Sequence, residues 1–507
     1  MTIATNTTER AAADPVLRPF AKGPVFAVAG AVAAVLLLVN GRYGYFGDEL
    51  YFLAAGRHLD WGYADQPPAL PLLAHLMDLL APGSVWALRL PAVLATAAAV
   101  VFTGLIAREL GGGARAQLLA AGAAGVSMQF LGGGHYLATS TLDPFLWTVV
   151  LWLLTRWLRT RSDGLLLWGG VVTGLALNVK FLIPAFWVVA LLFAAWLGPR
   201  DLLARPKLWL GAGIALLMAV PTVWWQAANG WPQLDMGAAI GDENPDKLAA
   251  ALAFPVVALG SAGIVVGVVL VLHGLWRLLR TPSLRFLGWT LLVLTVVFAV
   301  AGGRFYYVAG MFPLCWAVAA VRIEAGQARR WWRWVATWPV YAISALIAVP
   351  LTLPVLPASV LDANPSLPQP LFTMAERGWP EFADSVAAVH RSLPPEQRER
   401  TAIVTQVYWQ ASALDHYGPE RGLPEPASGN RGYWTLTTPP ASADTVLYVG
   451  ADSPVLRAHF AEVVQVGVVD TGLPSAPMFT QGAPIWLATG PSAPLPELWP
   501  AFRDLAL

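Results

Sequence analysis

Cysteine, lysine and charged residues in general are scarce in this sequence of 507 residues. The single cysteine, Cys315, lies inside an apolar run, so disulfide bonds and cysteine-based zinc sites are excluded within one chain. Only four lysines occur and no basic cluster is present, which leaves no signature of nucleic-acid binding. Charged residues make up 12% of the chain, whereas about a quarter is usual for a soluble protein. This scarcity of charge indicates a protein that resides in lipid.

Long apolar runs take the place of the missing charge. Hydrophobic residues make up 56% of the chain, and the mean hydropathy is +0.56. Segments of roughly 17–25 mainly apolar residues are long enough to span a bilayer. The predicted spans are 24–40, 86–107, 116–132, 140–158, 163–179, 181–198, 208–226, 249–275, 285–302, 305–321 and 334–356. The sequence therefore predicts a polytopic α-helical membrane protein with about eleven transmembrane helices.

The distribution of arginine and lysine predicts the orientation of these helices. Basic residues precede the first span and follow every second span after it, which is typical of cytoplasmic connections. The prediction is a cytoplasmic tail at 1–23, a transmembrane domain at 24–357 and an extracytoplasmic region at 358–507, in the cytoplasmic membrane. In the last region, short apolar runs at 401–407 and 445–449 alternate with turn signals, which indicates a small α/β domain.

The predicted outer loop at 41–85 contains two adjacent carboxylates, Asp48 and Glu49. Ionisable groups beside lipid are costly and tend to be functional. One carboxylate could act as a general base toward a hydroxyl group, or the pair could help to bind a divalent cation. Equally, both could stabilise the N-terminus of a predicted helix over residues 49–59. These alternatives are evenly balanced on chemistry alone.

A series of motifs runs through this loop and the spans after it. They are Gly44-Tyr45-Phe46-Gly47-Asp48-Glu49-Leu50-Tyr51, residues 56–59, residues 61–63, Asp65-Gln66-Pro67-Pro68, Arg89-Leu90-Pro91-Ala92, Leu142-Asp143-Pro144, Asn229-Gly230-Trp231-Pro232 and Tyr306-Tyr307. The series resembles the family 39 glycosyltransferases, bacterial relatives of the protein O-mannosyltransferases and the lipid A aminoarabinose transferases. The resemblance covers roughly residues 40–320 and implies the membrane fold called GT-C.

By this resemblance, the protein would transfer a sugar from a polyprenyl phosphate to an acceptor hydroxyl on the outer face. Asp48 matches the family's catalytic base, and Asp143 matches a second acidic position near the site. Glu49 is the remaining catalytic candidate, although support of the helix start is its favoured role. Gln66 stands where many relatives have the lysine assigned to the donor phosphate, and it brings no charge. Another cation is therefore expected to bind the phosphate.

Four cations on the predicted outer face are candidates for this role. Lys180 and Arg304 are favoured, and Arg57 and Arg89 are the alternatives, while snorkelling to lipid headgroups is the competing interpretation for each. Further substrate-binding candidates on the same face are Tyr45, His58, Trp61, Asp65, Gln66, His135, Tyr306 and Tyr307. No metal-binding spacing accompanies His58 or His135, so no metal site is predicted, and a divalent cation stays open as a cofactor.

Two other functions remain open at the level of sequence. A transporter or lipid flippase would place charges near the membrane midplane and often shows two related halves. Here the charges gather at one face and no half-repeat is visible. A non-catalytic partner in envelope assembly is the other alternative. The sequence names neither the sugar nor the acceptor, which could be a protein, a glycan or a lipid.

Overall fold

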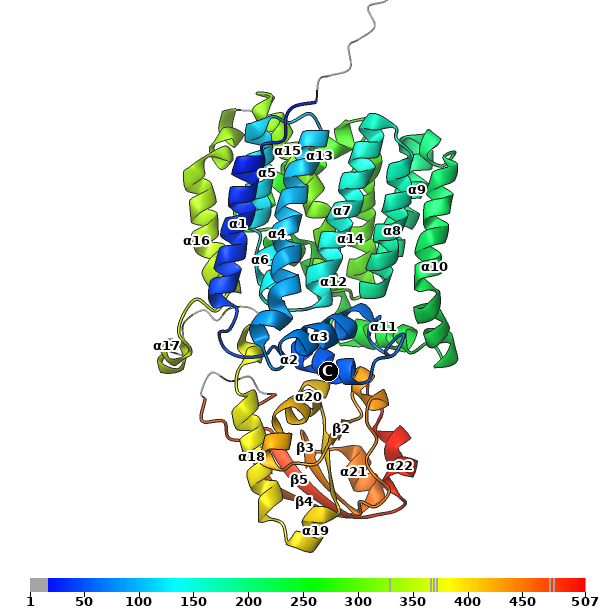
Figure 1. The fold of residues 1–507 in the computed structure, drawn as a ribbon, viewed down its shortest axis with the longest axis vertical. Coiled ribbons are helices and arrows are strands. Elements are labelled where there is room, and N and C mark those ends of the chain that lie inside the picture. Colours follow the sequence, from blue (N-terminus) through cyan, green and yellow to red (C-terminus); the bar gives the residue numbers. More distant parts are fainter. Residues whose placement is uncertain are drawn as a thin grey trace, which may run out of the picture.

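The computed structural model describes residues 17–243, 245–327, 330–364, 367, 370, 373–473, 476 and 479–506. Most of the predicted tail at 1–23 lies outside these ranges. Figure 1 shows two layers, a bundle of long, roughly parallel helices and a smaller α/β region at one end of it. Short helices lie across the end of the bundle, between the two layers.

The helices of the bundle and of its connections follow the predicted apolar runs. They are α1 (Lys22–Val39), α2 (Gly47–Arg57), α3 (Ala69–Leu80), α4 (Val85–Glu109), α5 (Ala114–Gly125), α6 (Met128–His135), α7 (Thr139–Thr160), α8 (Gly164–Val179), α9 (Ile183–Leu197), α10 (Pro206–Ala228), α11 (Pro232–Asp242), α12 (Lys247–Ser261), α13 (Val266–Arg280), α14 (Arg285–Val300), α15 (Phe312–Glu324), α16 (Trp338–Thr352) and α17 (Ala358–Ala363). The 3₁₀ helices η1 (Arg200–Leu202), η2 (Phe305–Met311) and η3 (Arg330–Ala336) lie between them.

Four helices in the described ranges are long and apolar enough to cross a membrane by themselves: α1, α4, α10 and the continuous segment Phe305–Glu324. A fifth span results if α12 and α13 are counted as one bent crossing. Shorter apolar helices such as α8, α9, α14 and α16 run alongside them in Figure 1. The number of eleven spans and their orientation stay predictions.

The segment 249–275 differs from the single span predicted for it. It contains most of α12 and α13, which meet at an angle of 111°. Gly263 has φ +116°, and a Cβ there would approach the carbonyl oxygen of Val126 to 3.0 Å. The break therefore packs against the gap between α5 and α6, where the Ser127 hydroxyl donates to the Ser261 carbonyl at 3.2 Å. Irregular backbone inside a bundle of apolar helices is tolerated where protein groups satisfy its hydrogen bonds. Hydropathy alone does not reveal such a bend.

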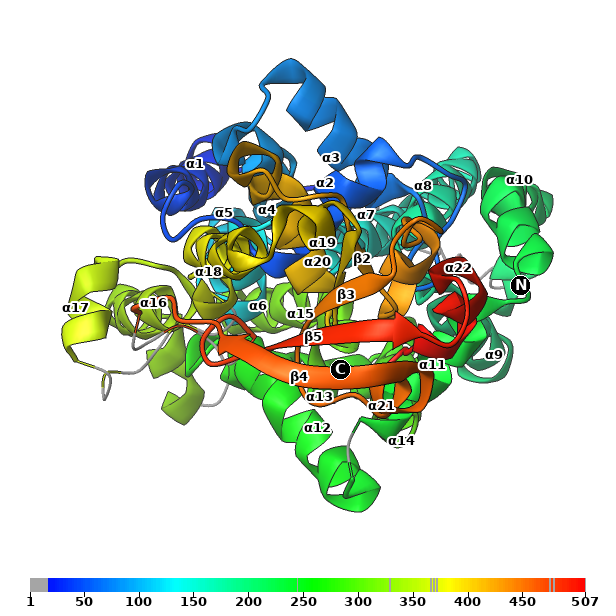
Figure 2. The ribbon, with the colours of Figure 1, turned by 90° about the horizontal axis from the view of Figure 1, so that it is seen from below.

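The α/β region contains a mixed sheet of five strands. Its helices and strands are α18 (Trp379–Ser392), α19 (Pro395–Glu399), β1 (Thr401–Thr405), α20 (Tyr408–Tyr417), β2 (Pro426–Ser428), β3 (Thr445–Val449), α21 (Pro454–His459), β4 (Phe460–Val468), β5 (Pro484–Pro491) and α22 (Leu495–Leu498), with 3₁₀ helices η4 (Thr373–Glu376), η5 (Pro419–Arg421), η6 (Arg431–Thr435) and η7 (Trp499–Phe502). The strand order is β2-β1-β3-β5-β4. Strand β1 is parallel to β2 and β3, whereas β5 is antiparallel to β3 and β4. Figure 2 shows β3, β5 and β4 side by side beneath the bundle.

The loop at 41–85 forms the interface between the two layers. It contains α2 and α3, and its buried apolar residues share one core with α18 and α20. Leu50 and Phe52 of α2 belong to this core, together with Phe382 of α18 and Leu414 of α20. Helix α2 begins two residues earlier than predicted, and the Phe46 backbone N–H donates to the Glu49 carboxylate at 2.9 Å. The interpretation of Glu49 as a support for the helix start is therefore confirmed.

Candidate active site

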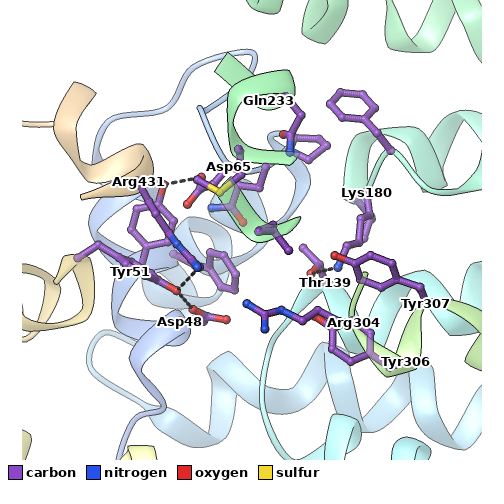
Figure 3. Close-up of a pocket in the computed structure, with 18 residues that line it drawn as sticks. Asp48, Tyr51, Asp65, Thr139, Lys180, Gln233, Arg304, Tyr306, Tyr307 and Arg431 are labelled. Carbon is purple, nitrogen blue, oxygen red and sulfur yellow. Dashed lines mark hydrogen bonds between the residues drawn. The ribbon is translucent and has the colours of Figure 1, made fainter. Parts of the chain in front are cut away.

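A polar cavity of about 150 Å³ lies where α2, α11 and the ends of several bundle helices meet the α/β region. Its lining residues include Asp48, Tyr51, Asp65, Gln66, Thr139, Lys180, Gln233, Arg304, Tyr306, Tyr307, Tyr408 and Arg431. Figure 3 shows that the charged side chains from these separate elements point toward one another. The cavity unites seven residues predicted as site residues: Asp48, Asp65, Gln66, Lys180, Arg304, Tyr306 and Tyr307.

The carboxylate of Asp48 is oriented by two donors from the α/β region. The Tyr408 hydroxyl and the Trp409 indole N–H donate to its Oδ1 atom at 2.6 and 2.7 Å. Burial, together with the nearby Asp48 carboxylate, raises the pKa of the Tyr408 hydroxyl, so this group stays a donor. No donor in the described part of the chain reaches Oδ2 of Asp48. This oxygen therefore remains able to accept a proton.

Glu49 lies outside the cavity in a buried ionic network. Its carboxylate accepts hydrogen bonds from Arg89 at 2.8–3.2 Å and from the Leu137 backbone N–H at 3.0 Å. Arg89 also lies 3.2 Å from the His135 ring and 3.5 Å from the Glu376 carboxylate. Burial raises the pKa of Glu376 to about 8. Glu49, Arg89 and His135 are fully buried, so their positions favour a structural role over direct contact with a substrate.

The four predicted cations separate clearly in position. Lys180 lies over the rings of Tyr306 and Tyr307 at 4.9 and 4.5 Å, and its ammonium approaches the Thr139 hydroxyl at 3.5 Å. Arg304 forms an ion pair with Glu243 at the edge of the cavity. Arg57 instead pairs with Asp415 of α20, away from the cavity lining.

Asp65 and Gln66 come from the connection between α2 and α3. The Tyr51 hydroxyl donates to Asp65 at 2.9 Å, and burial raises the pKa of this carboxyl to about 6. Gln66 is buried, and its side-chain Nε2 has no hydrogen-bond partner within the described ranges. The cavity thus holds an unused donor at the position where the resemblance places a lysine in many relatives.

The remaining predicted site residues do not line the cavity. The Tyr45 hydroxyl donates to the Gly83 carbonyl at 2.8 Å, and Asp143 accepts from the Trp147 indole at 3.1 Å. His58 is exposed at the end of α2, and Trp61 is 61% exposed. No group of three or more His, Cys, Asp or Glu side chains that could hold a metal ion occurs in the described ranges.

The fold that contains this cavity is similar to that of known proteins. Residues 65–225 match the family described as dolichyl-phosphate-mannose-protein mannosyltransferase. The structure is similar to ArnT from Cupriavidus metallidurans in the apo state, with a TM-score of 0.59 and 15% identity, covering 94% of this chain and 99% of ArnT. ArnT bound to undecaprenyl phosphate gives a TM-score of 0.56 at 15% identity, covering 92% and 98%. The chain is a GT-C-fold glycosyltransferase.

The fold follows from the structural likeness, and the enzyme class from the family match together with it. The similarity to ArnT and the match to the protein mannosyltransferase family confirm the resemblance found in the sequence. Together with the long apolar helices of this chain, they indicate a multi-pass membrane protein. No curated protein matches the chain by sequence.

Three residues that contact the site of this GT-C-fold glycosyltransferase from the α/β region were absent from the sequence-based prediction: Tyr408, Trp409 and Arg431. Tyr408 is 360 residues from Asp48 along the chain, and no motif of the membrane part points to it. Arg431 reaches the cavity from the α/β region and forms an ion pair with Glu243 at 2.8 Å. The only available signal was the missing lysine at Gln66, which called for a cation without locating it.

Proposed function

We propose that this protein transfers a monosaccharide from a polyprenyl-phosphate donor to an acceptor hydroxyl, with Asp48 as the general base. The observation that carries the proposal is a carboxylate with one free oxygen in the same cavity as Lys180 and Arg304. A general base needs an accessible oxygen close to the reacting hydroxyl. A departing phosphate needs nearby positive charge. The cavity offers both.

The reaction is a single displacement. The acceptor oxygen attacks C1 of the sugar while its proton passes to Oδ2 of Asp48. The new bond joins the acceptor oxygen to C1, and the bond between C1 and the phosphate oxygen breaks. The electron pair leaves with the polyprenyl phosphate, so the configuration at C1 inverts. The leaving phosphate needs neutralisation by cations and no general acid.

Lys180 and Arg304 are the proposed phosphate-binding cations of the bundle. Both line the cavity, and in the described part of the chain no carboxylate lies within ion-pair distance of the Lys180 ammonium. The Arg89 guanidinium is already bonded to Glu49, and Arg57 is paired with Asp415. Lys180 and Arg304 line the cavity, whereas Arg57 and Arg89 do not, so the first two are better placed to contact a substrate.

An apolar groove beside the cavity suits the prenyl chain of such a donor. It measures about 350 Å³ and is lined by α6, α12 and α16 residues together with Tyr136 and Phe305. Phe305 directly precedes Tyr306 of the polar cavity, so the groove and the cavity share one segment of chain. The similar ArnT structure was obtained with undecaprenyl phosphate bound, which supports a donor of this class. The arginine distribution supports a site on the outer face of the cell membrane.

The replacement Asp48→Asn tests the assignment of the base. Asparagine retains a side-chain oxygen that can accept from Tyr408 and Trp409, so the fold should persist while the proton acceptor is lost. Transfer should fall by about 10²-fold or more, measured in membranes with labelled undecaprenyl-phosphate hexoses and pentoses. Asp78→Asn is the matched control, because Asp78 lies in the same loop, away from the cavity, and accepts from the Gly83 backbone N–H at 3.0 Å. Near-normal transfer by Asp48→Asn would exclude Asp48 as the base.

A further inference from the structure

We propose that Arg431 of the α/β region binds the donor phosphate and supplies the positive charge that Gln66 lacks. This inference rests on the proposed function, because it assigns a residue to the same cavity. Arg431 lines the same cavity as the bundle residues Lys180 and Arg304 (Figure 3). Three cations from separate elements then surround one space, and one of them belongs to the α/β region.

The backbone of the α/β region fixes the position of Arg431 beside the cavity. Its φ of +50° lies in the left-handed region, which costs a non-glycine residue about 1–2 kcal/mol. The Arg431 N–H donates to the Asp504 carbonyl at 2.8 Å, so the position is fixed from the α/β region. The next residue, Gly432, packs so closely that a Cβ would clash with the Tyr51 hydroxyl and the Asp65 carboxylate. The segment therefore lies directly against the first loop.

Unused donors in the cavity indicate a missing acceptor. The Nε atom of Arg431 and the Nε2 atom of Gln66 are both buried without a hydrogen-bond partner in the described part of the chain. Buried donors without acceptors are costly in free energy and therefore uncommon. A phosphate group offers several acceptor oxygens and pairs well with a guanidinium group. Arg431 and Gln66 together thus suit a phosphate oxygen better than a neutral ligand.

Glu243 balances the arginines while no phosphate is present. Its carboxylate pairs with Arg431 at 2.8 Å and also with Arg304. A phosphate entering the cavity competes with this carboxylate for the same two guanidinium groups. Removing the charge of Glu243 should therefore strengthen phosphate binding, whereas removing the charge of Arg431 should weaken it.

The competing interpretation is that Arg431 only joins the α/β region to the bundle. Under that interpretation, loss of either partner of the Arg431–Glu243 ion pair has the same effect. The two variants Arg431→Gln and Glu243→Gln therefore separate the interpretations by the sign of their effects. Arg421→Gln is a matched control, since Arg421 pairs with Asp384 at 2.7 Å and lies over the Tyr417 ring at 5.8 Å, away from the cavity.

The experiment measures binding of labelled undecaprenyl phosphate, and of uncharged undecaprenol, to the full chain in lipid nanodiscs. Arg431→Gln should weaken binding of the phosphate about tenfold or more and leave binding of undecaprenol unchanged. Arg431→Lys should retain part of the binding, Glu243→Gln should tighten it, and Arg421→Gln should resemble the wild type. Adding Gln66→Lys to Arg431→Gln should restore binding, because it returns a cation to the cavity.

Folding of each variant is checked on the same samples. Cys315 is buried and is the only cysteine, so its reaction with a thiol-specific dye on heating reports unfolding. Equal losses in Arg431→Gln and Glu243→Gln, or unchanged binding in Arg431→Gln, would overturn the inference while the proposed function stands. A wild type that binds undecaprenol as tightly as undecaprenyl phosphate would overturn the proposed function itself. If Arg431→Gln does not fold, weaker phosphate binding by Glu243→Gln is the result that excludes the inference.

Discussion

Replacement of Arg89 by methionine should destabilise the protein strongly, even though Arg89 lies outside the cavity. The Arg89 guanidinium is fully buried and donates to the Glu49 carboxylate at 2.8–3.2 Å. It also donates to the carbonyl oxygens of Asn40 at 2.6 Å and Gly44 at 2.8 Å. Methionine has a similar length and no donor, so the two carbonyls lose this donor and Glu49 keeps only backbone donors, such as those of Phe46 and Leu137, against its buried charge.

The expected magnitude follows from these contacts. Removing one partner of a buried ion pair costs about 3–5 kcal/mol, because the other charge stays buried. Each carbonyl left without its donor adds about 1–3 kcal/mol. Native proteins are stable by only about 5–15 kcal/mol in total. The loss should therefore be a large fraction of the free energy of unfolding of the protein.

The measurement compares Arg89→Met with Lys180→Met by thermal unfolding of purified protein, read from dye access to Cys315. In the described part of the chain, Lys180 approaches the Thr139 hydroxyl at 3.5 Å, contacts Tyr306 and Tyr307 and forms no ion pair, although Asp143 attracts it electrostatically. Lys180→Met should therefore unfold near the wild-type temperature and bind undecaprenyl phosphate poorly. Arg89→Met should unfold at a much lower temperature.

The opposite result would refute the separation of structural from substrate-binding cations. If Arg89→Met kept the wild-type unfolding temperature and lost phosphate binding, Arg89 would be the donor cation after all. If Lys180→Met bound undecaprenyl phosphate as tightly as the wild type, the assignment of Lys180 would be wrong. In either case, the buried ionic network around Glu49 would no longer serve to distinguish the two roles.

Two further outcomes are expected. Burial raises the pKa of Glu376 from 4.5 in the unfolded chain to about 8. Its contribution to stability is therefore present below pH 4.5 and is lost as the pH rises toward 8. The unfolding temperature of the wild type relative to Glu376→Gln should fall across this range, and a difference independent of pH would contradict the assignment. Tyr408→Phe removes a 2.6 Å hydrogen bond to Asp48 while Trp409 still donates. The value of kcat should therefore fall about tenfold, while the affinity for undecaprenyl phosphate stays unchanged. Equal effects on kcat and on this affinity would show that Tyr408 only supports the fold.

Much of the bundle could be predicted because lipid imposes a simple requirement on length and hydropathy. Each predicted span corresponds to a helix or a pair of helices in Figure 1. The bend between α12 and α13 could not be predicted, since Gly263 lies inside an apolar run and its reason is the packing against Val126. The local role of Glu49 was predictable, because a carboxylate three residues after Phe46 can reach its backbone N–H.

Separating Asp48 from Glu49 required the structure, because the two differ in what surrounds them rather than in type. Asp48 faces the cavity from the first turn of α2, whereas Glu49 lies against Arg89. The sequence favoured Lys180, at a turn between two predicted spans, and Arg304, directly before Phe305-Tyr306-Tyr307, over Arg57 and Arg89. Lys180 and Arg304 line the cavity, whereas Arg57 pairs with Asp415 and Arg89 is buried against Glu49, and the preference stays a prediction.

Arg431 shows where reading a sequence by its motifs reaches its limit. The search for a missing cation was confined to the membrane part, because the motifs that defined the site ended near residue 320. The α/β region shares a core with α2, however, and Gly432 in the first turn of η6 lies against Asp65. A positive charge needed beside Gln66 can thus come from any element that packs against the same side of the cavity. If Gln66→Lys restores phosphate binding to Arg431→Gln, the two positions are alternative sources of one charge, and the α/β region is part of the active site.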